Sequence, residues 1–400
     1  MASISSPSKS PLYRVYTDRF ILSPGPTEIP DRARLAMARK TTNPDLDEDF
    51  LRFYNNVRDK VKRLLSSYRA DVYLLVGEAI LGLEAAIANT IRRGDKVLVI
   101  ANGVFGEGFA DIVKLYGGEP IAIASSDWRR SVDLYEVERA LERYRDAEII
   151  TLVHCDTPSA LLNDLRGVAK IASERGVALI VDAVSSIGGV NIDFDGWGVD
   201  ILIGGSQKTL NAPAGVTIMA IKRDMWDRIE RVSYKGLYLD LKLWREMLDG
   251  KGVFPYTMSE PLIYALDEAL NILFEEGLEN VYKRHENAGR ASWEAGIALG
   301  LEPYAASIEH SSPTVSAYLT PQGVDEKRLR SHIWSKYGVM LAGSWGKLES
   351  KVIRVGHMGI QASRSHLILA YTALARGLRD LGYEVNIARA LEAIENTMSP

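Results

Sequence analysis

The chain contains 400 residues, of which 46% are hydrophobic and 25% are charged, and its formal net charge is −4. This composition is ordinary for a globular protein with a large core, and it gives no sign of a nucleic-acid partner or a membrane surface. No apolar stretch approaches the roughly 20 residues that cross a bilayer, and the single cysteine, Cys155, excludes an internal disulfide and a thiolate metal cluster.

The first residues, 1–19, are predicted to form a flexible arm. Residues 1–11 are rich in Ser and Pro and lack the apolar core of a secretion signal, so we expect a protein of the reducing cytoplasm. The next segment, Phe20 to Pro30, contains three prolines and a glycine, Gly25. These residues predict a turn-rich loop and exclude a helix.

Strands and helices are predicted to alternate after this loop. Near-continuous apolar strands separated by helices indicate a mainly parallel sheet covered on both faces, with ligands bound at the carboxyl ends of its strands. The predicted strands are 72–76, 96–100, 120–124, 148–153, 178–182 and 199–205, and the predicted helices are one from Asp31, 47–65, one that opens after Gly77, 109–116, 132–144 and 164–174.

The pattern changes from about Leu270. A long amphipathic helix, 269–298, is broken near Gly277 and leads into shorter strands at 314–319 and 352–355 and two helices. This order predicts a smaller α+β unit. We therefore expect three parts: the arm 1–19, a large domain 20–275 and a small C-terminal domain 276–400.

Asp182 and Lys208 are the first candidates for chemistry. Each follows a predicted buried strand, so both are expected at the same edge of the sheet. This pairing suits pyridoxal 5′-phosphate (PLP), because the lysine amine binds the aldehyde and the aspartate keeps a proton on the pyridine nitrogen. By spacing alone, a turn carboxylate and a solvated surface lysine remain the alternative.

Six short motifs strengthen the PLP interpretation. Together they resemble the class V, fold-type I PLP aminotransferases, over about residues 20–381, and are most similar to the serine/alanine–glyoxylate (or pyruvate) type. The resemblance implies PLP as cofactor, a seven-stranded, mainly parallel sheet with a smaller C-terminal α+β domain, and a homodimer with a shared active site. The motifs are Pro24-Gly25-Pro26, Gly77-Glu78-Ala79 with Glu84-Ala85-Ala86, residues 102–106, 181–189 and 205–213, and Arg354-Val355-Gly356.

The resemblance also implies roles for individual residues. Lys208 would bind the cofactor aldehyde and later move a proton between substrate and cofactor, and Asp182 would pair with the pyridine nitrogen. The other cofactor contacts it implies are Glu78, Ala79, Ile80 and Gln207 at the phosphate, Phe105 and Val184 on the two faces of the ring, Thr157 at its phenolic oxygen, and Tyr256 and Thr257 at the phosphate of the neighbouring subunit.

At the phosphate, the chain departs from the family. The helix that opens after Gly77 would offer free N–H groups and a positive dipole. Relatives usually carry Gly-Ser-Gly here, whereas this chain reads Gly77-Glu78-Ala79. We therefore expect the backbone at Ala79 and Ile80, rather than a side chain, to bind the phosphate. The segment around Thr157 also departs from relatives, at Pro158 and Ala160.

Arg354 and Gly25 are the candidates for substrate binding. A fixed guanidinium fork suits a bidentate α-carboxylate, and a structural salt bridge is the alternative role for Arg354. The loop 41–45 lacks a histidine that many relatives carry near the substrate. A P-loop, a dinucleotide-binding glycine motif and a metal site find no support in the sequence.

These motifs predict a ping-pong transaminase that moves the amino group of serine or alanine to glyoxylate or pyruvate. Three alternatives stay open: a class V aminotransferase with another donor, such as aspartate or an aminophosphonate; a PLP lyase on the same fold; and a subunit that has lost catalysis. No nucleic-acid, membrane or metal partner is expected.

Overall fold

The computed structural model describes residues 19–123 and 128–398. The predicted arm, 1–19, therefore lies outside the described residues except for its last member, as does residue 124 at the end of a predicted strand.

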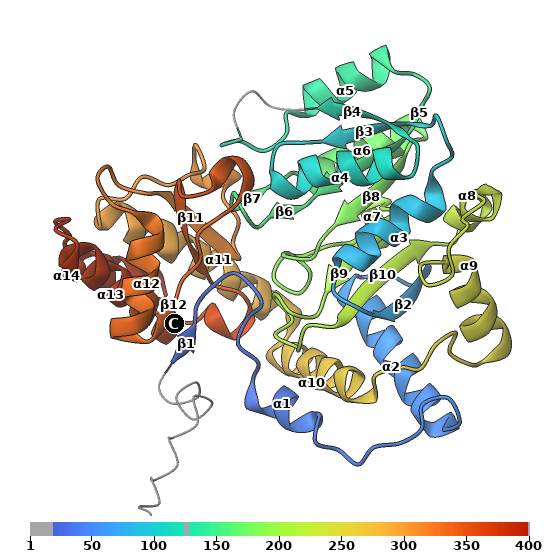
Figure 1. Cartoon of the computed structure of the whole chain (residues 1–400), viewed down its shortest axis with the longest axis horizontal. Helices are drawn as coiled ribbons and strands as arrows, with labels where there is room; N and C mark the ends of the chain where they lie inside the picture. Colours follow the sequence, from blue (N-terminus) through green and yellow to red (C-terminus); the bar gives the residue numbers. More distant parts are fainter. Residues whose placement is uncertain (1–18, 124–127, 399–400) are drawn as a thin grey trace, which may run out of the picture.

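A seven-stranded sheet forms the centre of the larger half of the molecule (Figure 1). The strand order is β2-β10-β9-β8-β5-β3-β4, and all strands are parallel except β10, which is antiparallel to both neighbours. The predicted mainly parallel sheet is confirmed, although the sequence analysis missed β10. The strands are β2 (Ala70–Val76), β3 (Lys96–Ile100), β4 (Glu119–Ile123), β5 (Ala147–Val153), β8 (Ala178–Asp182), β9 (Ile201–Gly205) and β10 (Val216–Lys222).

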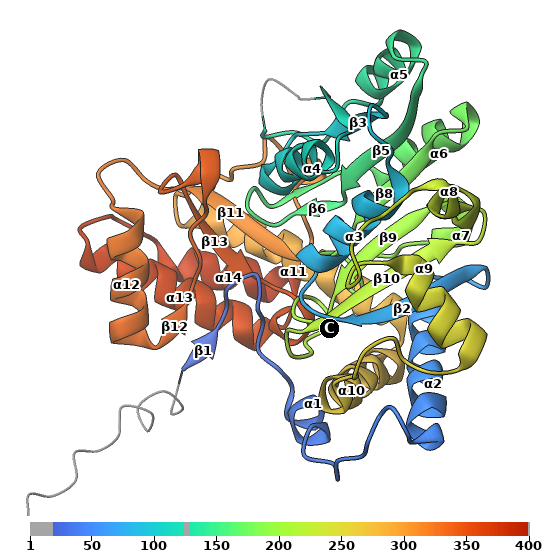
Figure 2. The same cartoon turned by 45° about the vertical axis from the view of Figure 1, so that its right-hand side comes forward.

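Helices pack on the sheet (Figures 1 and 2). Most of them begin or end where the sequence supplies a cap. The Asp47 carboxylate accepts hydrogen bonds from the amides of Asp49 and Phe50 and starts α2, while Gly176, at φ 65°, ends α6. The helices of this half are α1 (Asp31–Ala36), α2 (Glu48–Leu64), α3 (Ile80–Thr90), α4 (Val104–Leu115), α5 (Leu134–Arg143), α6 (Leu165–Arg175), α7 (Phe194–Trp197), α8 (Met225–Arg231), α9 (Leu241–Trp244), the π-helical turn η2 (Arg245–Gly250) and α10 (Glu260–Glu276).

Two predicted helix starts are wrong. Helix α4 begins at Val104 rather than at residue 109, because a carboxylate from a distant segment, Asp156, caps its first turn. Helix α10 begins at Glu260 rather than at residue 269, with a proline in its first turn, where no helical hydrogen bond is lost.

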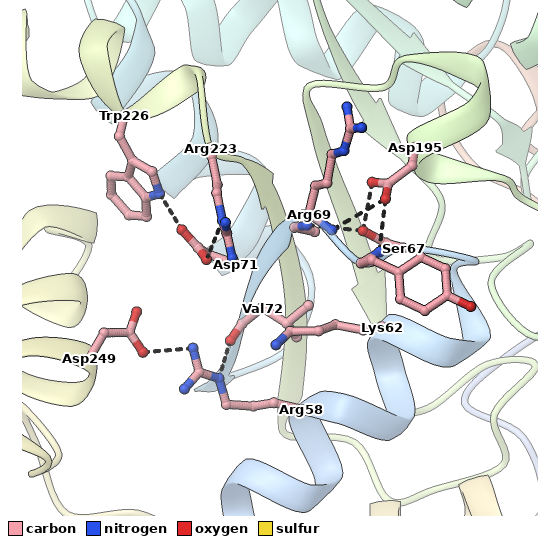
Figure 3. Close-up of polar contacts among 12 residues, drawn as sticks. Arg58, Lys62, Ser67, Arg69, Asp71, Val72, Asp195, Arg223, Trp226 and Asp249 are labelled. Atoms are coloured by element: carbon pink, nitrogen blue, oxygen red, sulfur yellow. Dashed lines mark hydrogen bonds and ion pairs between the residues drawn. The ribbon is translucent and has the colours of Figure 1, made fainter.

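The outer edge of the sheet, β2, is covered by side chains rather than by another strand. The Tyr54 hydroxyl accepts from the Leu74 amide at 2.9 Å and donates to the Leu74 carbonyl at 3.0 Å. Figure 3 shows the neighbouring contacts: Arg58 donates to the Val72 carbonyl and pairs with Asp249. These groups satisfy the exposed edge of β2 and block pairing with another chain.

The start of β2 is also tied to the helices around it. In Figure 3 the Trp226 indole donates to Asp71 at 2.8 Å, and the Ser67 hydroxyl donates to Asp195 at 2.7 Å. Asp71 belongs to β2, Trp226 to α8 and Asp195 to α7. These polar contacts therefore hold the sheet at the end opposite Asp182 and Lys208, where they have a structural role.

A second hydrophobic core lies in the C-terminal part of the chain. It is built largely on helices that follow Gly277, and three of them, α12, α13 and α14, follow β11, where two were predicted. Its elements include α11 (Leu278–Ala298), β11 (Val315–Leu319), α12 (Glu326–Tyr337), β12 (Val339–Met340), β13 (Val352–Gly356), α13 (Arg364–Asp380) and α14 (Ile387–Thr397).

The start of the described chain joins this second core. Strand β1 (Phe20–Ile21) pairs in parallel with β12, and Leu22 is fully buried among the residues of the C-terminal core. The division into domains 20–275 and 276–400 stays a prediction. None of the helices within the described ranges combines the length and apolar character of a membrane span.

Candidate active site

A small cavity of about 160 Å³ opens at the carboxyl ends of β8 and β9. Larger grooves on the surface, up to about 860 Å³, contain none of the predicted site residues. Nine of the predicted residues line the small cavity, so the structure brings together side chains that are up to 130 positions apart (208 − 78). The lining residues are Glu78, Ala79, Ile80, Leu83, Phe105, Cys155, Thr157, Asp182, Val184, Ser185, Gln207 and Lys208.

Lys208 lies just beyond the end of β9, with its amine held inside the cavity. The Nζ group donates to the Pro24 carbonyl at 3.0 Å and to the Thr157 hydroxyl at 3.2 Å. Burial, with the nearby positive charge of Arg354, lowers the pKa of Lys208 to about 8. A substantial fraction of the amine is therefore neutral, and nucleophilic, at a slightly alkaline pH.

Gly25 leaves the room that the lysine occupies. Its φ is +96°, and a Cβ added there would lie 2.4 Å from Cδ of Lys208. Any other residue at this position would be strained and would displace the amine. The predicted substrate contact at Gly25 is not among the cavity-lining residues, but the glycine packs directly against Lys208.

Asp182 ends β8 and is only 5% exposed. Its Oδ1 accepts a hydrogen bond from the Val184 amide at 2.9 Å. Burial raises the pKa of Asp182 to about 7, while the Val184 amide and the charge of Lys208 oppose the rise. A buried carboxylate of this kind is stabilised by a cationic partner in the cavity.

Thr157 connects the lysine to a residue that sequence reasoning missed. Its hydroxyl hydrogen-bonds both Lys208 and the hydroxyl of Ser185, which also lines the cavity. Ser185 belongs to the motif 181–189 and follows Asp182 by three positions, so its place after β8 was the available signal.

The first turn of α3 forms one end of the cavity. Ile80 is the first residue of this helix, and no acceptor for the amides of Ala79 and Ile80 is found among the described residues. Gln207 Oε1 is buried there and has no hydrogen-bond partner within the same residues. The exposed Glu78 adds a carboxylate to this end, and no ion pair to it is found in the described part of the chain.

Arg354 lies beside the cavity rather than in its lining. Its Nε donates to the Gly343 carbonyl at 2.5 Å, and its Nη1 donates to the Thr157 carbonyl at 2.9 Å. The side chain is 4% exposed, and no ion-pair partner for it is found in residues 19–123 and 128–398. The structural salt bridge considered as the alternative role is therefore not seen in these ranges.

Trp345 joins Arg354 to Phe105, and no sequence signal pointed to it. The centre of its ring is 5.7 Å from the centre of the Phe105 ring, edge on, and 5.1 Å from Cζ of Arg354. The indole thus forms a wall between a cavity residue and the guanidinium.

Tyr256 and Thr257 are not brought to the cavity of their own chain. The Tyr256 hydroxyl donates to the Leu237 carbonyl at 2.5 Å and its ring stacks on Tyr238, while the exposed Thr257 donates to Asp45 at 3.1 Å. Their predicted contact with a neighbouring subunit stays a prediction.

Cys155 lines the cavity but is a poor nucleophile. Burial raises the pKa of its thiol to about 11, and Sγ donates to the Ser312 hydroxyl at 3.0 Å. Within the described ranges, no group of three His, Cys, Asp or Glu side chains could hold a metal ion.

Comparison with known proteins identifies the family of the chain. Residues 22–299 match the family model described as Aminotransferase class-V. The pyridoxamine–pyruvate transaminase of Mesorhizobium japonicum is 34% identical over 356 residues, 88% of this chain and 90% of that protein. The serine–glyoxylate aminotransferase of Methylorubrum extorquens is 33% identical over 371 residues, 90% of this chain and 91% of that protein. The crystal structure of an alanine–glyoxylate aminotransferase from Nostoc sp. superposes with a TM-score of 0.87 at 30% identity, covering 91% of this chain and 96% of the other.

Proposed function

Because the chain belongs to the class V aminotransferase family, we propose that it moves the amino group of serine or alanine to glyoxylate or pyruvate. The family depends on PLP. The observation that carries the proposal is one buried cavity that holds Lys208 and Asp182 beside Arg354, a guanidinium with no carboxylate partner in the described residues.

The cavity contains the groups that the pyridine ring of this cofactor requires. Lys208 would bind the aldehyde, and Asp182 would hold a proton on the ring nitrogen. The buried Gln207 Oε1, which has no hydrogen-bond partner in the described residues, supports a polar ligand at this end of the cavity. Phe105 and Val184 would flank the ring, and Thr157 would bind its phenolic oxygen. The amides of Ala79 and Ile80 are free to bind the phosphate.

When bound, PLP supplies an electron sink for the negative charge that develops at the substrate Cα. Lys208 would then act as the acid and base that moves a proton between the substrate Cα and the cofactor, and its lowered pKa suits this exchange. Arg354 would hold the α-carboxylate through Nη2, for which the described residues supply no partner, since Nε and Nη1 are already bound to backbone carbonyls. Donor and acceptor share this carboxylate, so one cation serves both half-reactions.

The proposal includes a cytoplasmic homodimer. Two observations support the homodimer: Tyr256 and Thr257 lie away from their own cavity, and Leu237 and Tyr238 beside them are 69% and 49% exposed. Exposed apolar side chains of this size, gathered around one segment, suit an interface with a second copy.

A second candidate donor, pyridoxamine, is favoured by Glu78. One relative is named a pyridoxamine–pyruvate transaminase. In this chain the end of the cavity predicted to bind phosphate carries the Glu78 carboxylate and no serine, threonine or basic side chain of the 77–80 turn. Two like charges at about 4 Å repel by roughly 1–4 kcal/mol, so this end would favour an unphosphorylated pyridine, which would occupy the cavity as a substrate.

A matrix of donors and acceptors separates the two candidates. Serine, alanine and pyridoxamine are each paired with glyoxylate and pyruvate, and kcat/KM is measured with and without added PLP. The first candidate predicts PLP-dependent turnover of serine or alanine, and the second predicts turnover of pyridoxamine without PLP. Aspartate and an aminophosphonate complete the donor set. Ammonia released from serine without an acceptor would indicate a lyase.

The Glu78→Ala variant sharpens this comparison. If the carboxylate disfavours phosphate, the variant binds PLP at least about fivefold more tightly relative to pyridoxal, because the like charge is gone. Glu138→Ala is the matched control, since Glu138 is an exposed glutamate far from the cavity lining. An unchanged ratio of the two dissociation constants would remove the support for pyridoxamine.

A further inference from the structure

Asp156 is a buried carboxylate between two cavity residues, Cys155 and Thr157, and no motif gave it a role. Asp156 is only 1% exposed. It does not line the cavity. A carboxylate is kept in such a place only if other groups stabilise its charge.

The carboxylate is stabilised by donors from two segments. Oδ1 accepts a hydrogen bond from the Phe105 amide at 2.9 Å. Oδ2 accepts from the Ser159 amide at 3.2 Å and from the Ser159 hydroxyl at 2.6 Å. Burial raises the pKa of Asp156, and these donors, with the amide of Val104, oppose the rise.

Two of those donors belong to the first turn of α4. Val104 and Phe105 are its first two residues, and the residue before them, Gly103, has no side chain to cap the helix. Asp156 therefore serves as the cap from a segment more than 50 positions away (156 − 105). A negative charge at this end of the 12-residue helix is also favoured by its dipole.

Gly103 shows how closely the two segments fit. A Cβ added to Gly103 would lie 2.3 Å from Cγ and 2.5 Å from Oδ2 of Asp156. Such a distance is far inside van der Waals contact, so a side chain at position 103 would push the carboxylate away from α4. The glycine and the aspartate form one packed unit.

Asp156 also balances the charge of the site. It favours the charged forms of Lys208 and Arg354, and it disfavours the ionised form of Asp182. The buried ionisable side chains that interact here are thus two basic groups, Lys208 and Arg354, and two carboxyl groups, Asp182 and Asp156.

We propose that Asp156 is a positioning residue of the active site, which fixes the first turn of α4 and thereby the Phe105 ring at the cavity wall. The inference rests on the proposed function in one respect: Phe105 is taken as the residue that stacks on the cofactor ring. Asp156 touches neither substrate nor cofactor, and it acts through Phe105.

The test is a double-mutant cycle on PLP affinity with Asp156→Asn and Phe105→Ala. Asparagine keeps the shape of the aspartate side chain, but it has one accepting oxygen instead of two. Its NH₂ group cannot accept a hydrogen bond, so the donors on one of the two sides lose their partner. Each single change should weaken PLP binding about tenfold, the loss typical of a hydrogen bond to a charged group or of a ring contact. The double variant should bind PLP as Phe105→Ala does, because Asp156 acts through that ring. Tenfold losses that multiply to about a hundredfold would overturn the proposal.

Two further measurements keep the test decisive. Hydrogen exchange of the cofactor-free protein should become faster in residues 103–109 of Asp156→Asn and stay unchanged in α6. Ser159→Ala is the control, because it leaves the hydrogen bond from the Phe105 amide to Oδ1 of Asp156 in place. The PLP affinity of this variant should stay within about twofold of that of the wild type. If Asp156→Asn does not fold, Gly103→Ala replaces it in the cycle, since its Cβ displaces the carboxylate without removing the charge.

The outcomes separate this inference from the proposed function. If the wild-type protein does not bind PLP, the cofactor proposal fails, whereas faster exchange in residues 103–109 of the variant still supports Asp156 as the cap of α4. If PLP affinity, the circular dichroism of bound PLP and hydrogen exchange of Asp156→Asn all equal those of the wild type, Asp156 has no positioning role.

Discussion

At the scale of single residues, Asp182 and Lys208 differ from surface groups because burial shifts both pKa values toward neutrality. In the folded, cofactor-free protein, burial favours the protonated form of Asp182 and the neutral amine of Lys208 more than exposure to water would, so both groups titrate close to neutral pH. A positively charged pyridine would stabilise the ionised form of Asp182, and its aldehyde would react with the neutral amine of Lys208. Neither shift can be read from the sequence, since each depends on burial.

The Asp182 shift predicts how the stability of the cofactor-free protein depends on pH. Its pKa rises from 3.8 to about 7 on folding, so between these values the folded state binds more protons than the unfolded state. The contribution of Asp182 is therefore fully present below about pH 4 and is lost as pH rises through about 7. Thermal unfolding of wild type and Asp182→Asn from pH 4 to pH 8 checks this.

The comparison isolates one group because the asparagine that replaces Asp182 in the variant does not titrate. We expect the wild-type Tm to fall relative to that of the variant as pH rises, by an amount that saturates above pH 7. A Tm difference that is constant across the range would show that the carboxylate has an ordinary pKa in the folded protein.

A second prediction at this scale is that replacing Arg354 lowers kcat/KM for every substrate alike. Arg354→Ala should lower kcat/KM for donor and acceptor by roughly 10- to 150-fold, the equivalent of a charge-assisted hydrogen bond of about 1.5–3 kcal/mol. Arg354→Lys should recover little, because an ammonium cannot form the guanidinium fork. PLP absorbance should stay normal in both. Loss of PLP with an unchanged KM would make Arg354 structural.

At the scale of elements, Trp345 belongs to the segment 343–348, which joins the C-terminal part of the chain to the cavity. Ser344 donates to the Pro158 carbonyl at 3.0 Å, and the Gly343 carbonyl accepts from Arg354. Trp345 itself is 44% exposed, with its ring against both Arg354 and Phe105. This segment therefore orients the guanidinium of Arg354, through the Gly343 carbonyl and the partly exposed ring of Trp345.

Removing the indole should loosen Arg354 without changing its charge. A cation–π contact contributes about 0.5–2 kcal/mol, so Trp345→Ala should raise KM for donors and acceptors by roughly 2- to 30-fold. Trp345→Phe should recover part of the loss, and Trp128→Ala, which removes an indole from the same region but not from Arg354, is the control. A change in kcat alone, with KM constant, would contradict this role.

The same elements show what the sequence could and could not predict. Strands β8 and β9 were predicted because apolar runs end at Asp182 and before Lys208, and the cavity lies where those strands end. The start of α4 was missed because its cap is Asp156, far away in sequence, and glycines 103, 106 and 108 obscure the helical pattern. Trp345 was missed because its partners, Phe105 and Arg354, are distant in sequence, and no motif or residue spacing indicates these contacts.

At the scale of the whole molecule, the larger core contributes residues to the cavity lining, and hydrogen bonds beside the cavity join it to the C-terminal part of the chain. Thr157 lies in the larger half and Arg354 on β13, so their hydrogen bond joins the two parts of the chain. The segment 20–30 also joins the two parts, since Leu22 is in the second core and the Pro24 carbonyl accepts a hydrogen bond from Lys208. A relative movement of the two parts would change the position of the guanidinium.

The proposed homodimer predicts complementation between subunits. Lys208→Ala and Thr257→Ala proteins are each expected to be impaired, and mixing them after partial unfolding should restore activity in heterodimers that carry one intact site. The control mixes each variant with itself. A fully active monomer in solution, measured by light scattering, would contradict the shared site.

The most direct test of the central claim is to reduce the protein with borohydride in the presence of PLP, or of pyridoxal, and to map the labelled peptide. We expect one label per chain, on Lys208, because that amine is buried in the cavity beside Asp182 and has a pKa of about 8. Lys208→Ala should take up no label, while Lys222→Ala, at the end of β10, should label as the wild type does. A label on another lysine, or none in the wild type, would contradict the claim that this cavity is the active site.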